Sequence, residues 1–170
     1  MTMLKKTILS LAAVAALSAC QASAPGGSKV IETAPATGVA RAMTAGNALS
    51  LTSQQRARHG LGALRQDARL QRAAQVLANH MARQGRIGHE GPGGSRMADR
   101  MKVAGYTPCF GVENVAFGQN SPAEVVRAWM ESPGHRKNML DGRAADAGIA
   151  MAVDGSGYPY WAMVAATHCR

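Results

Sequence analysis

The stretch that decides the fold spans residues 112–140 and reads VENVAFGQNSPAEVVRAWMESPGHRKNML. It begins with an apolar run that is typical of a β-strand and that carries one carboxylate, Glu113. An ionised carboxylate in such a run costs several kcal/mol unless a partner satisfies it. Further along, a Ser-Pro-Gly break ends a helix and fixes the direction of the His135 imidazole. An acid on a strand and a histidine on a turn can converge on one cleft.

The helix between these two groups has clear start signals. Ser121 can accept hydrogen bonds from the first free backbone amides, Pro122 suits the first helical position, and Glu124 completes a capping box. The apolar face of this helix consists of Val125, Val126 and Trp129.

Three helices are expected before this stretch. The first covers 49–60, and the second is capped by Asp67 and closed by Gly85. An i, i+3, i+4 stripe on the second consists of Leu70, Ala74, Leu77, Ala78 and Met81. A short third helix is expected over 95–103, where the charged side chains are expected to form an exposed face: Arg96, Asp99, Arg100 and Lys102.

The histidines before residue 112 differ in their settings. His89 lies in the glycine-rich loop 88–94, where no packing demand explains an imidazole, and it is therefore a candidate site residue. His59 and His80 lie in helical patterns, and we expect them to be structural or to face solvent.

The C-terminal part predicts a small sheet. Apolar runs at 148–153 and 158–167 flank an Asp-Gly-Ser-Gly turn at 154–157, a pattern typical of a β-hairpin. With the strand at 112–116, at least three short antiparallel strands are expected. Because helices precede and separate them, the sequence predicts an α+β fold, a three-layer α-β-α sandwich with a small antiparallel sheet.

Residues 1–19 have the features of a signal peptide. Lys5 and Lys6 precede an apolar core over 7–17, which is shorter than the ~20 residues that span a bilayer. Residues 17–20, Leu-Ser-Ala-Cys, resemble the bacterial lipoprotein box, which implies cleavage before Cys20 and its acylation. An ordinary secretory signal with a chance cysteine is the alternative. Several acyl chains anchor a protein stably where a single chain is marginal.

An anchor at Cys20 predicts a location in the cell envelope. Gln21 stands where an Asp would resemble an inner-membrane retention signal, which favours the outer membrane, facing the periplasm or the surface. Residues 20–46 are rich in Ala, Ser, Thr, Pro and Gly, and are expected to form a flexible tether. Residues 47–170 suit one compact domain.

The composition limits the partners. The chain carries 19 Lys and Arg against 10 Asp and Glu, and loss of Lys5 and Lys6 lowers the net charge from +9 to +7. A basic surface suits nucleic acid, anionic lipid or an anionic wall polymer, and the alternative is a generic solvated surface that favours contact with an anionic envelope. Nucleic acid is not expected as a partner, because no recognition motif occurs and seven aromatic residues offer no stacking platform.

The cysteines suggest one bridge. If Cys20 is acylated, Cys109 and Cys169 remain as a pair in an oxidising compartment. Their disulfide would tie the last strand to the loop that enters the Glu113 strand. Two free thiols in a poorly oxidising envelope are the alternative.

Taken together, the order of these features resembles the CAP superfamily, also called SCP or PR-1-like domains, in its bacterial branch. The resemblance covers residues 47–170 and rests on the Trp-x-x-Ser-Pro-Gly-His-Arg run at 129–136 together with the Glu-Asn pair at 113–114. It implies the α-β-α fold with a large open cleft. Many members carry two His and two Glu in that cleft, and some bind a divalent cation there, often zinc.

Three positions match the cleft residues of the family. His89 matches the first histidine, Glu113 the Glu of the Glu-Asn motif, and His135 the histidine of the bacterial Gly-His-Arg motif. The second Glu of the family's cleft has no match in this sequence. Ser132 stands at its position, and Glu131, one position earlier, would point about 100° away around a helix. This set can hold Zn²⁺ with water in an open fourth position, or it can form a hydrogen-bonded polar cleft without metal.

The resemblance leaves three functions open. The first is a non-enzymatic binding module, anchored in the envelope, for a lipid or another envelope component. The second is a zinc-dependent hydrolase acting on peptide or ester bonds, in which Glu90 is the remaining candidate for a general base. The third is a structural wall-associated domain. We expect the binding module, because no clear base remains once Glu113 is a metal ligand.

Overall fold

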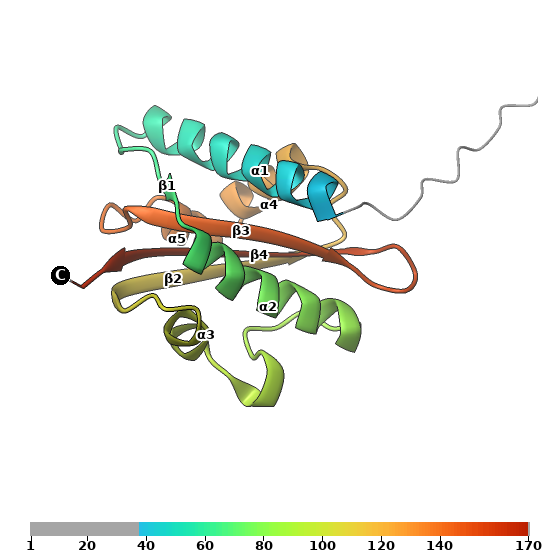
Figure 1. The fold of residues 1–170 in the computed structure, drawn as a ribbon. Coiled ribbons are helices and arrows are strands. Elements are labelled where there is room, and N and C mark those ends of the chain that lie inside the picture. Colours follow the sequence, from blue (N-terminus) through green and yellow to red (C-terminus); the bar gives the residue numbers. More distant parts are fainter. Residues whose placement is uncertain (1–37, 170) are drawn as a thin grey trace, which may run out of the picture. The chain divides into compact units, whose positions relative to one another are not determined.

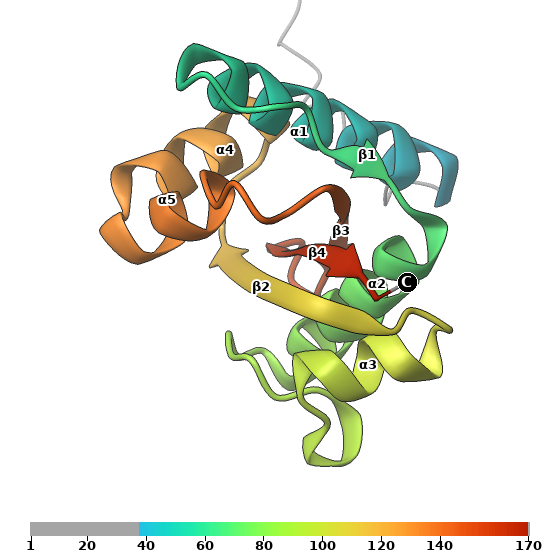
Figure 2. The same cartoon turned by 90° about the vertical axis from the view of Figure 1, so that its left-hand side faces the viewer.

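The computed structural model describes residues 38–169, with side chains from residue 44, and they form a sheet between two helical layers (Figures 1 and 2). The elements are α1 (Gly38–Arg58), β1 (Arg65–Gln66), α2 (Ala68–Gln84), a 3₁₀ turn (Pro92–Gly94), α3 (Met97–Val103), β2 (Pro108–Phe117), α4 (Pro122–Glu131), α5 (Pro133–Met139), β3 (Asp146–Val153) and β4 (Pro159–His168). The predicted α+β sandwich is confirmed. None of the helices within the described residues is long and apolar enough to cross a membrane.

The sheet is mixed rather than wholly antiparallel. Its strand order is β1-β3-β4-β2, with β2 and β3 antiparallel to β4 and β1 parallel to β3. The predicted antiparallel strands are present, and the difference is β1, whose two exposed residues carry no apolar alternation that a sequence pattern could reveal. Because β2 pairs only with β4, it is an edge strand.

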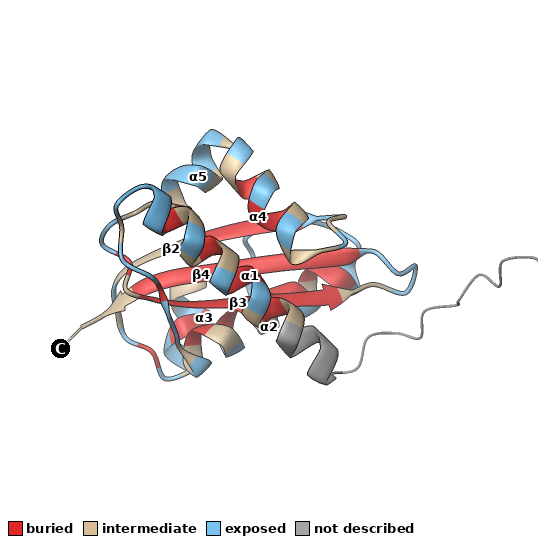
Figure 3. Ribbon diagram, turned by 90° about the horizontal axis from the view of Figure 1, so that it is seen from above, coloured by how far each residue is buried: buried red, intermediate tan, exposed pale blue. Residues whose placement is uncertain are grey.

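Alternation along β4 separates two cores. Alternate residues from Tyr160 to Ala166 pack toward α2 and α3, whereas Trp161, Met163 and Ala165 pack toward α1, α4 and α5. Figure 3 shows the buried residues concentrated in the strands and on the inner sides of the helices. Both cores lie entirely within 48–166, so this part of the chain carries its own hydrophobic interior.

The boundaries of α2 follow from the predicted caps. The Asp67 carboxylate accepts from the backbone N–H groups of Arg69 and Leu70, and Gly85 closes the helix in the left-handed conformation at φ 60°. The predicted apolar stripe is buried against the sheet. Asp67 and Gly85 are therefore confirmed as the ends of this helix.

The first helix begins earlier than predicted. It starts at Gly38 instead of residue 49, so residues 38–46, assigned above to the tether, are helical, and Ala45 is 3% exposed. Small residues such as alanine leave a weak hydrophobic pattern even where they pack. The predicted signal peptide, Cys20 and the rest of the predicted tether lie outside the described residues.

The start of α4 is capped with one difference from the prediction. The Ser121 hydroxyl accepts from the Glu124 N–H at 3.2 Å, but the Glu124 carboxylate accepts from the Asn120 N–H at 2.9 Å and not from Ser121. The reciprocal bond of the capping box therefore lies one residue earlier.

The Ser-Pro-Gly break begins a new helix. The prediction of a turn around His135 is wrong, because α5 runs from Pro133 to Met139. Ser132 caps the end of α4 and the start of α5, and Pro133 occupies a position where its fixed φ favours a first helical turn. The break changes the direction of the helix and leaves His135 on the first turn of α5.

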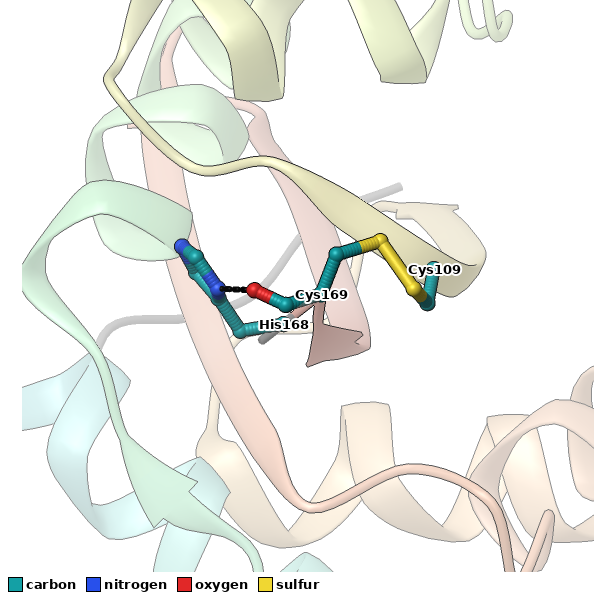
Figure 4. The surroundings of a disulfide bond; sticks show 3 residues. All are labelled: Cys109, His168 and Cys169. Carbon is teal, nitrogen blue, oxygen red and sulfur yellow. Dashed lines mark hydrogen bonds between the residues drawn. A yellow bond between two sulfur atoms is a disulfide. The ribbon is translucent and has the colours of Figure 1, made fainter.

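A disulfide closes the C-terminal end of the sheet, as predicted. Cys109 and Cys169 are bonded, with their Cα atoms 4.9 Å apart. Figure 4 shows this bridge between the start of β2 and the residue after β4, beside the contact of the His168 ring with the Cys169 carbonyl oxygen. It ties two strands that already pair.

We expect Gly148→Ala to lower the free energy of unfolding by about 2–3 kcal/mol. A Cβ at Gly148 would lie 2.1 Å from the backbone nitrogen of Gln71, because α2 crosses β3 at close range. Urea unfolding measures the change. Gly142→Ala is the matched control, since its Cβ would meet no atom closer than 3.6 Å. Equal stability of the two variants would contradict this close approach.

Candidate functional site

The Glu113 carboxylate lies at the centre of the candidate site. Glu113 is 9% exposed on the edge strand β2. Its Oε1 atom accepts a hydrogen bond from His89 Nδ1 at 2.9 Å, and its Oε2 atom accepts one from Arg100 Nη2 at 2.6 Å. The predicted contact between Glu113 and a histidine is therefore present, and a second, cationic partner accompanies it.

Arg100 is buried, so the prediction that it belongs to an exposed face is wrong. The Arg100 side chain is 2% exposed, and its Nη1 atom donates to the carbonyl oxygens of His89 at 3.2 Å and Ser95 at 2.5 Å. One guanidinium thus holds both the carboxylate and the loop that carries His89. Gly91 permits this close packing, since a Cβ there would lie 3.0 Å from Arg100 Nη1.

A sequence signal for Arg100 was available. Met97, Arg100 and Met101 are spaced i, i+3, i+4, so they share one side of α3, and Met101 is buried. An arginine in an apolar stripe must find an acceptor when the stripe packs. Glu113, a carboxylate in an apolar strand, is the complementary acceptor.

The Glu113 carboxylate orients the His89 ring. Because Glu113 accepts from Nδ1, Nδ1 carries a proton and Nε2 is left for solvent or a ligand, on a side chain that is 60% exposed. The hydrogen bond to Glu113 raises the pKa of His89, and partial burial opposes this shift. Burial lowers the pKa of His135, and the charge of His89 lowers it further.

Two asparagines connect β2 to α5. Asn114 is fully buried, and its Nδ2 atom donates to the His135 carbonyl oxygen at 3.0 Å. Asn138 Nδ2 donates to the Glu113 carbonyl oxygen at 3.1 Å and to Asn114 Oδ1 at 2.9 Å. Asn138 thereby satisfies a carbonyl of the edge strand that has no strand partner. Both residues position α5 beside Glu113, a role that the sequence analysis missed.

An open groove of about 490 Å³ runs beside these groups. It is lined by His89, Glu90, Arg96, Met97, Gly111, Val112, Glu113 and Asn138. The structure thus places His89 and Glu113 in one groove, while His135 lies on the adjacent helix and is not among the lining residues. Glu131 points elsewhere, as predicted: its side chain is 71% exposed and lies 3.9 Å from Arg127.

These residues do not fit a zinc centre in this arrangement. The Arg100 guanidinium already contacts one carboxylate oxygen of Glu113, and His89 presents its protonated nitrogen to the other. His89 Nε2 keeps a lone pair for a metal, but a zinc centre needs three or four such protein ligands. Among the described residues, no group of three His, Cys, Asp or Glu side chains is arranged to hold a metal ion.

The two histidines are expected to titrate at different pH values. The pKa of His89 should lie above the ordinary value of about 6.5, and the pKa of His135 should lie below it. Since folding raises the pKa of His89, its pairing with Glu113 stabilises the protein fully below pH ~6.5, and this contribution disappears as the pH rises through the folded pKa. NMR of the imidazole resonances against pH measures both midpoints. Glu113→Gln should lower the His89 midpoint, and an unchanged midpoint would contradict the pairing.

The comparison with known families agrees with this architecture. Residues 49–165 match the model of the family described as "CAP: Cysteine-rich secretory protein family". The chain belongs to the CAP family. The uncharacterized protein YkwD of Bacillus subtilis (strain 168) is 35% identical to this CAP protein over 108 residues, which are 64% of this chain and 42% of YkwD. This chain therefore covers less than half the length of that relative.

Solved structures show the same CAP fold. An outer surface protein of Borrelia burgdorferi has a TM-score of 0.64 at 19% identity, covering 71% of this chain and 90% of that one. An extracellular protein of Bacillus anthracis that contains an SCP domain also has a TM-score of 0.64, at 22% identity, covering 78% of this chain and 45% of that one. Both likenesses concern the fold.

Proposed function

We propose that this CAP domain is a non-enzymatic binding module of the cell envelope, and that its ligand, a lipid or another envelope component, lies in the groove beside His89. The observation that carries the proposal is the double pairing of the buried Glu113 carboxylate with Arg100 and His89. Such pairing fixes the shape and charge of a binding site before the ligand arrives, which favours affinity.

The groove combines the two kinds of contact that binding sites use. Met97 and Val112 supply apolar surface, and the side chains of His89, Arg96 and Asn138 supply polar groups. His89 Nε2 has no hydrogen-bond partner among the described residues. A ligand group that bonds to Nε2 would meet a ring already oriented by Glu113.

The geometry does not favour the hydrolase alternative. Both carboxylate oxygens of Glu113 already accept from protein donors and its side chain is 5% exposed, so a water molecule that it could deprotonate has little access to it. Glu90 lines the groove but is exposed, and no hydrogen bond with another described residue orients its carboxylate. An unoriented, solvated carboxylate is a poor general base.

The anchoring part of the proposal rests on Cys20 and is tested separately. Cys20→Ala should release the protein from membranes or block its maturation, because acylation of this thiol supplies the anchor. Metabolic labelling with a palmitate analogue, followed by fractionation, measures both effects. A mature wild-type chain that remains unlabelled and starts at another residue would contradict the anchor.

The ligand is tested by extraction of purified full-length protein and mass spectrometry of the extract. Val112→Trp enlarges a side chain that lines the groove and also packs against the α1, α4 and α5 core, and with the fold verified by circular dichroism we expect it to lose the copurifying molecule. Ala123→Trp, at an exposed position of α4, is the control and should retain it. Equal recovery from both variants would place the ligand outside the groove. Turnover of a peptide or ester substrate that disappears in Glu113→Gln would contradict a non-enzymatic role.

A further inference from the structure

The outer surface of the α2–α3 layer carries an excess of cations. Five side chains form what we call the basic face: Arg72, Arg83, Arg86, Arg96 and Lys102. All five are exposed, and none forms an ion pair with another residue in the part of the chain with described side chains, 44–169. The carboxylates of the same region that lack a cationic partner are Glu90 and Asp99, and Asp99 caps α3 by accepting from the Arg96 N–H.

Exposed apolar side chains lie among these cations. Val103 is 91% exposed, Ile87 is 47% exposed and Val76 is 42% exposed. The other large apolar residues exposed within the described region, Phe117 and Tyr158, contact each other with ring centroids 5.7 Å apart. The helical layer of α1, α4 and α5 therefore exposes no large apolar side chain of this kind within the described residues.

The spacing of these residues places them on one surface. Arg72, Val76, Asn79 and Arg83 are spaced i, i+4, i+7, i+11, so they form one exposed stripe along α2. Figure 1 shows α2 and α3 on the side of the sheet opposite α1.

Two hollows lie on the α2–α3 layer. Arg72, Val76 and Val103 line one hollow of about 380 Å³ between α2 and α3. Arg86 and Ile87 line another of about 210 Å³ at the C-terminal end of α2. Each of the three exposed apolar residues therefore shares a hollow with an arginine of the basic face.

We propose that this surface docks on a membrane that contains anionic phospholipid. Each cation near an anionic bilayer adds to the attraction, and this attraction weakens as the salt concentration rises. Apolar side chains that insert at the headgroup boundary add hydrophobic contact, which electrostatics alone does not supply. A soluble anionic polymer would use the cations but gain nothing from Val103 and Ile87. The combination of both side-chain types on one layer favours the membrane. This proposal does not depend on the ligand of the groove.

The test uses residues 33–170, a compact unit that contains both cores and the disulfide but not Cys20. Sedimentation with phosphatidylcholine vesicles, with and without phosphatidylglycerol, measures binding. We expect the wild type to bind the anionic vesicles, and Arg72→Glu/Arg83→Glu to bind more than tenfold more weakly, since each cation contributes about fivefold. Arg58→Glu/Lys137→Glu, the same charge change on exposed residues of α1 and α5, should weaken binding by about threefold at most.

A second pair of variants separates membrane from polymer. Ile87→Ser/Val103→Ser preserves all charges and changes exposed side chains, so the fold should be kept, as circular dichroism can verify. We expect it to bind anionic vesicles several-fold more weakly than the wild type. Unchanged vesicle binding in this variant would overturn the proposal that this surface inserts into a membrane, because the cations alone would then account for binding, as they would with a soluble anionic polymer. Equal weakening by the two charge-reversal variants, or no wild-type binding, would overturn it altogether.

Discussion

Arg100→Met is expected to lower the free energy of unfolding by about 3–5 kcal/mol. The substitution keeps a long side chain in the apolar stripe of α3 but leaves the buried Glu113 carboxylate without its cation. It also removes the donor that serves the carbonyl oxygens of His89 and Ser95. The cost of a buried, uncompensated charge dominates this result. Urea unfolding near neutral pH measures it.

Two comparisons show whether the loss comes from the pair. Arg96→Met removes an exposed cation from the residue before α3 and should change stability by less than about 0.5 kcal/mol. Adding Glu113→Gln to Arg100→Met removes the unpaired charge and should recover a large part of the loss. If the double variant were less stable than Arg100→Met alone, the ion pair would not be the reason for the destabilisation.

Arg56→Met should produce the second large effect, and we expect it to lower the free energy of unfolding by about 3–5 kcal/mol. Arg56 is 2% exposed, and its guanidinium donates to four backbone carbonyl oxygens without contacting a carboxylate. The acceptors are the carbonyl groups of Gly62, Met139, Asp141 and Ala144. Each buried acceptor that loses its donor costs about 1–3 kcal/mol.

The control for Arg56 is Arg58→Met, in the same last turn of α1. Arg58 is exposed, so the free energy of unfolding of the control variant should lie within about 0.5 kcal/mol of the wild-type value. Because Arg56 joins the end of α1 to the end of α5, its loss should also shift NMR resonances of Asn138 on α5. Stability of Arg56→Met equal to that of Arg58→Met would contradict the role of this buried arginine.

Local sequence signals predicted the elements whose causes are local. Asp67 and Gly85 mark the ends of α2 through hydrogen bonds and a left-handed backbone within a few residues. The apolar runs around the turn at 154–157 became β3 and β4, because each alternates its side chains between two cores. The pairing of Cys109 with Cys169 followed from composition and compartment.

What the sequence analysis missed depends on partners far along the chain. Arg100 looked like one charge of an exposed face, and its contact with Glu113, thirteen residues later, shows why a cation in the stripe of Met97 and Met101 can be buried. Asn114 and Asn138 gain their roles from each other across β2 and α5. The turn predicted around His135 is a helix because Pro133 can begin a helix as readily as it can end one.

The family resemblance located Glu113 and His89 and left the chemistry of their surroundings open. A carboxylate and an imidazole in a cleft are compatible with zinc or with a hydrogen-bonded pair, and the sequence alone leaves both open. The buried Arg100 favours the hydrogen-bonded pair, because it supplies to Glu113 a positive charge that a metal ion would otherwise supply.

The central claim is that Arg100 and His89 hold Glu113 in a preformed, metal-independent groove. Calorimetric titration of residues 33–170 with Zn²⁺ near neutral pH tests it most directly, because this unit lacks Cys20 and its other two cysteines are bonded. We predict no saturable binding at micromolar Zn²⁺. Binding of one Zn²⁺ per chain in the wild type, lost in both Glu113→Gln and His89→Gln, would contradict the claim.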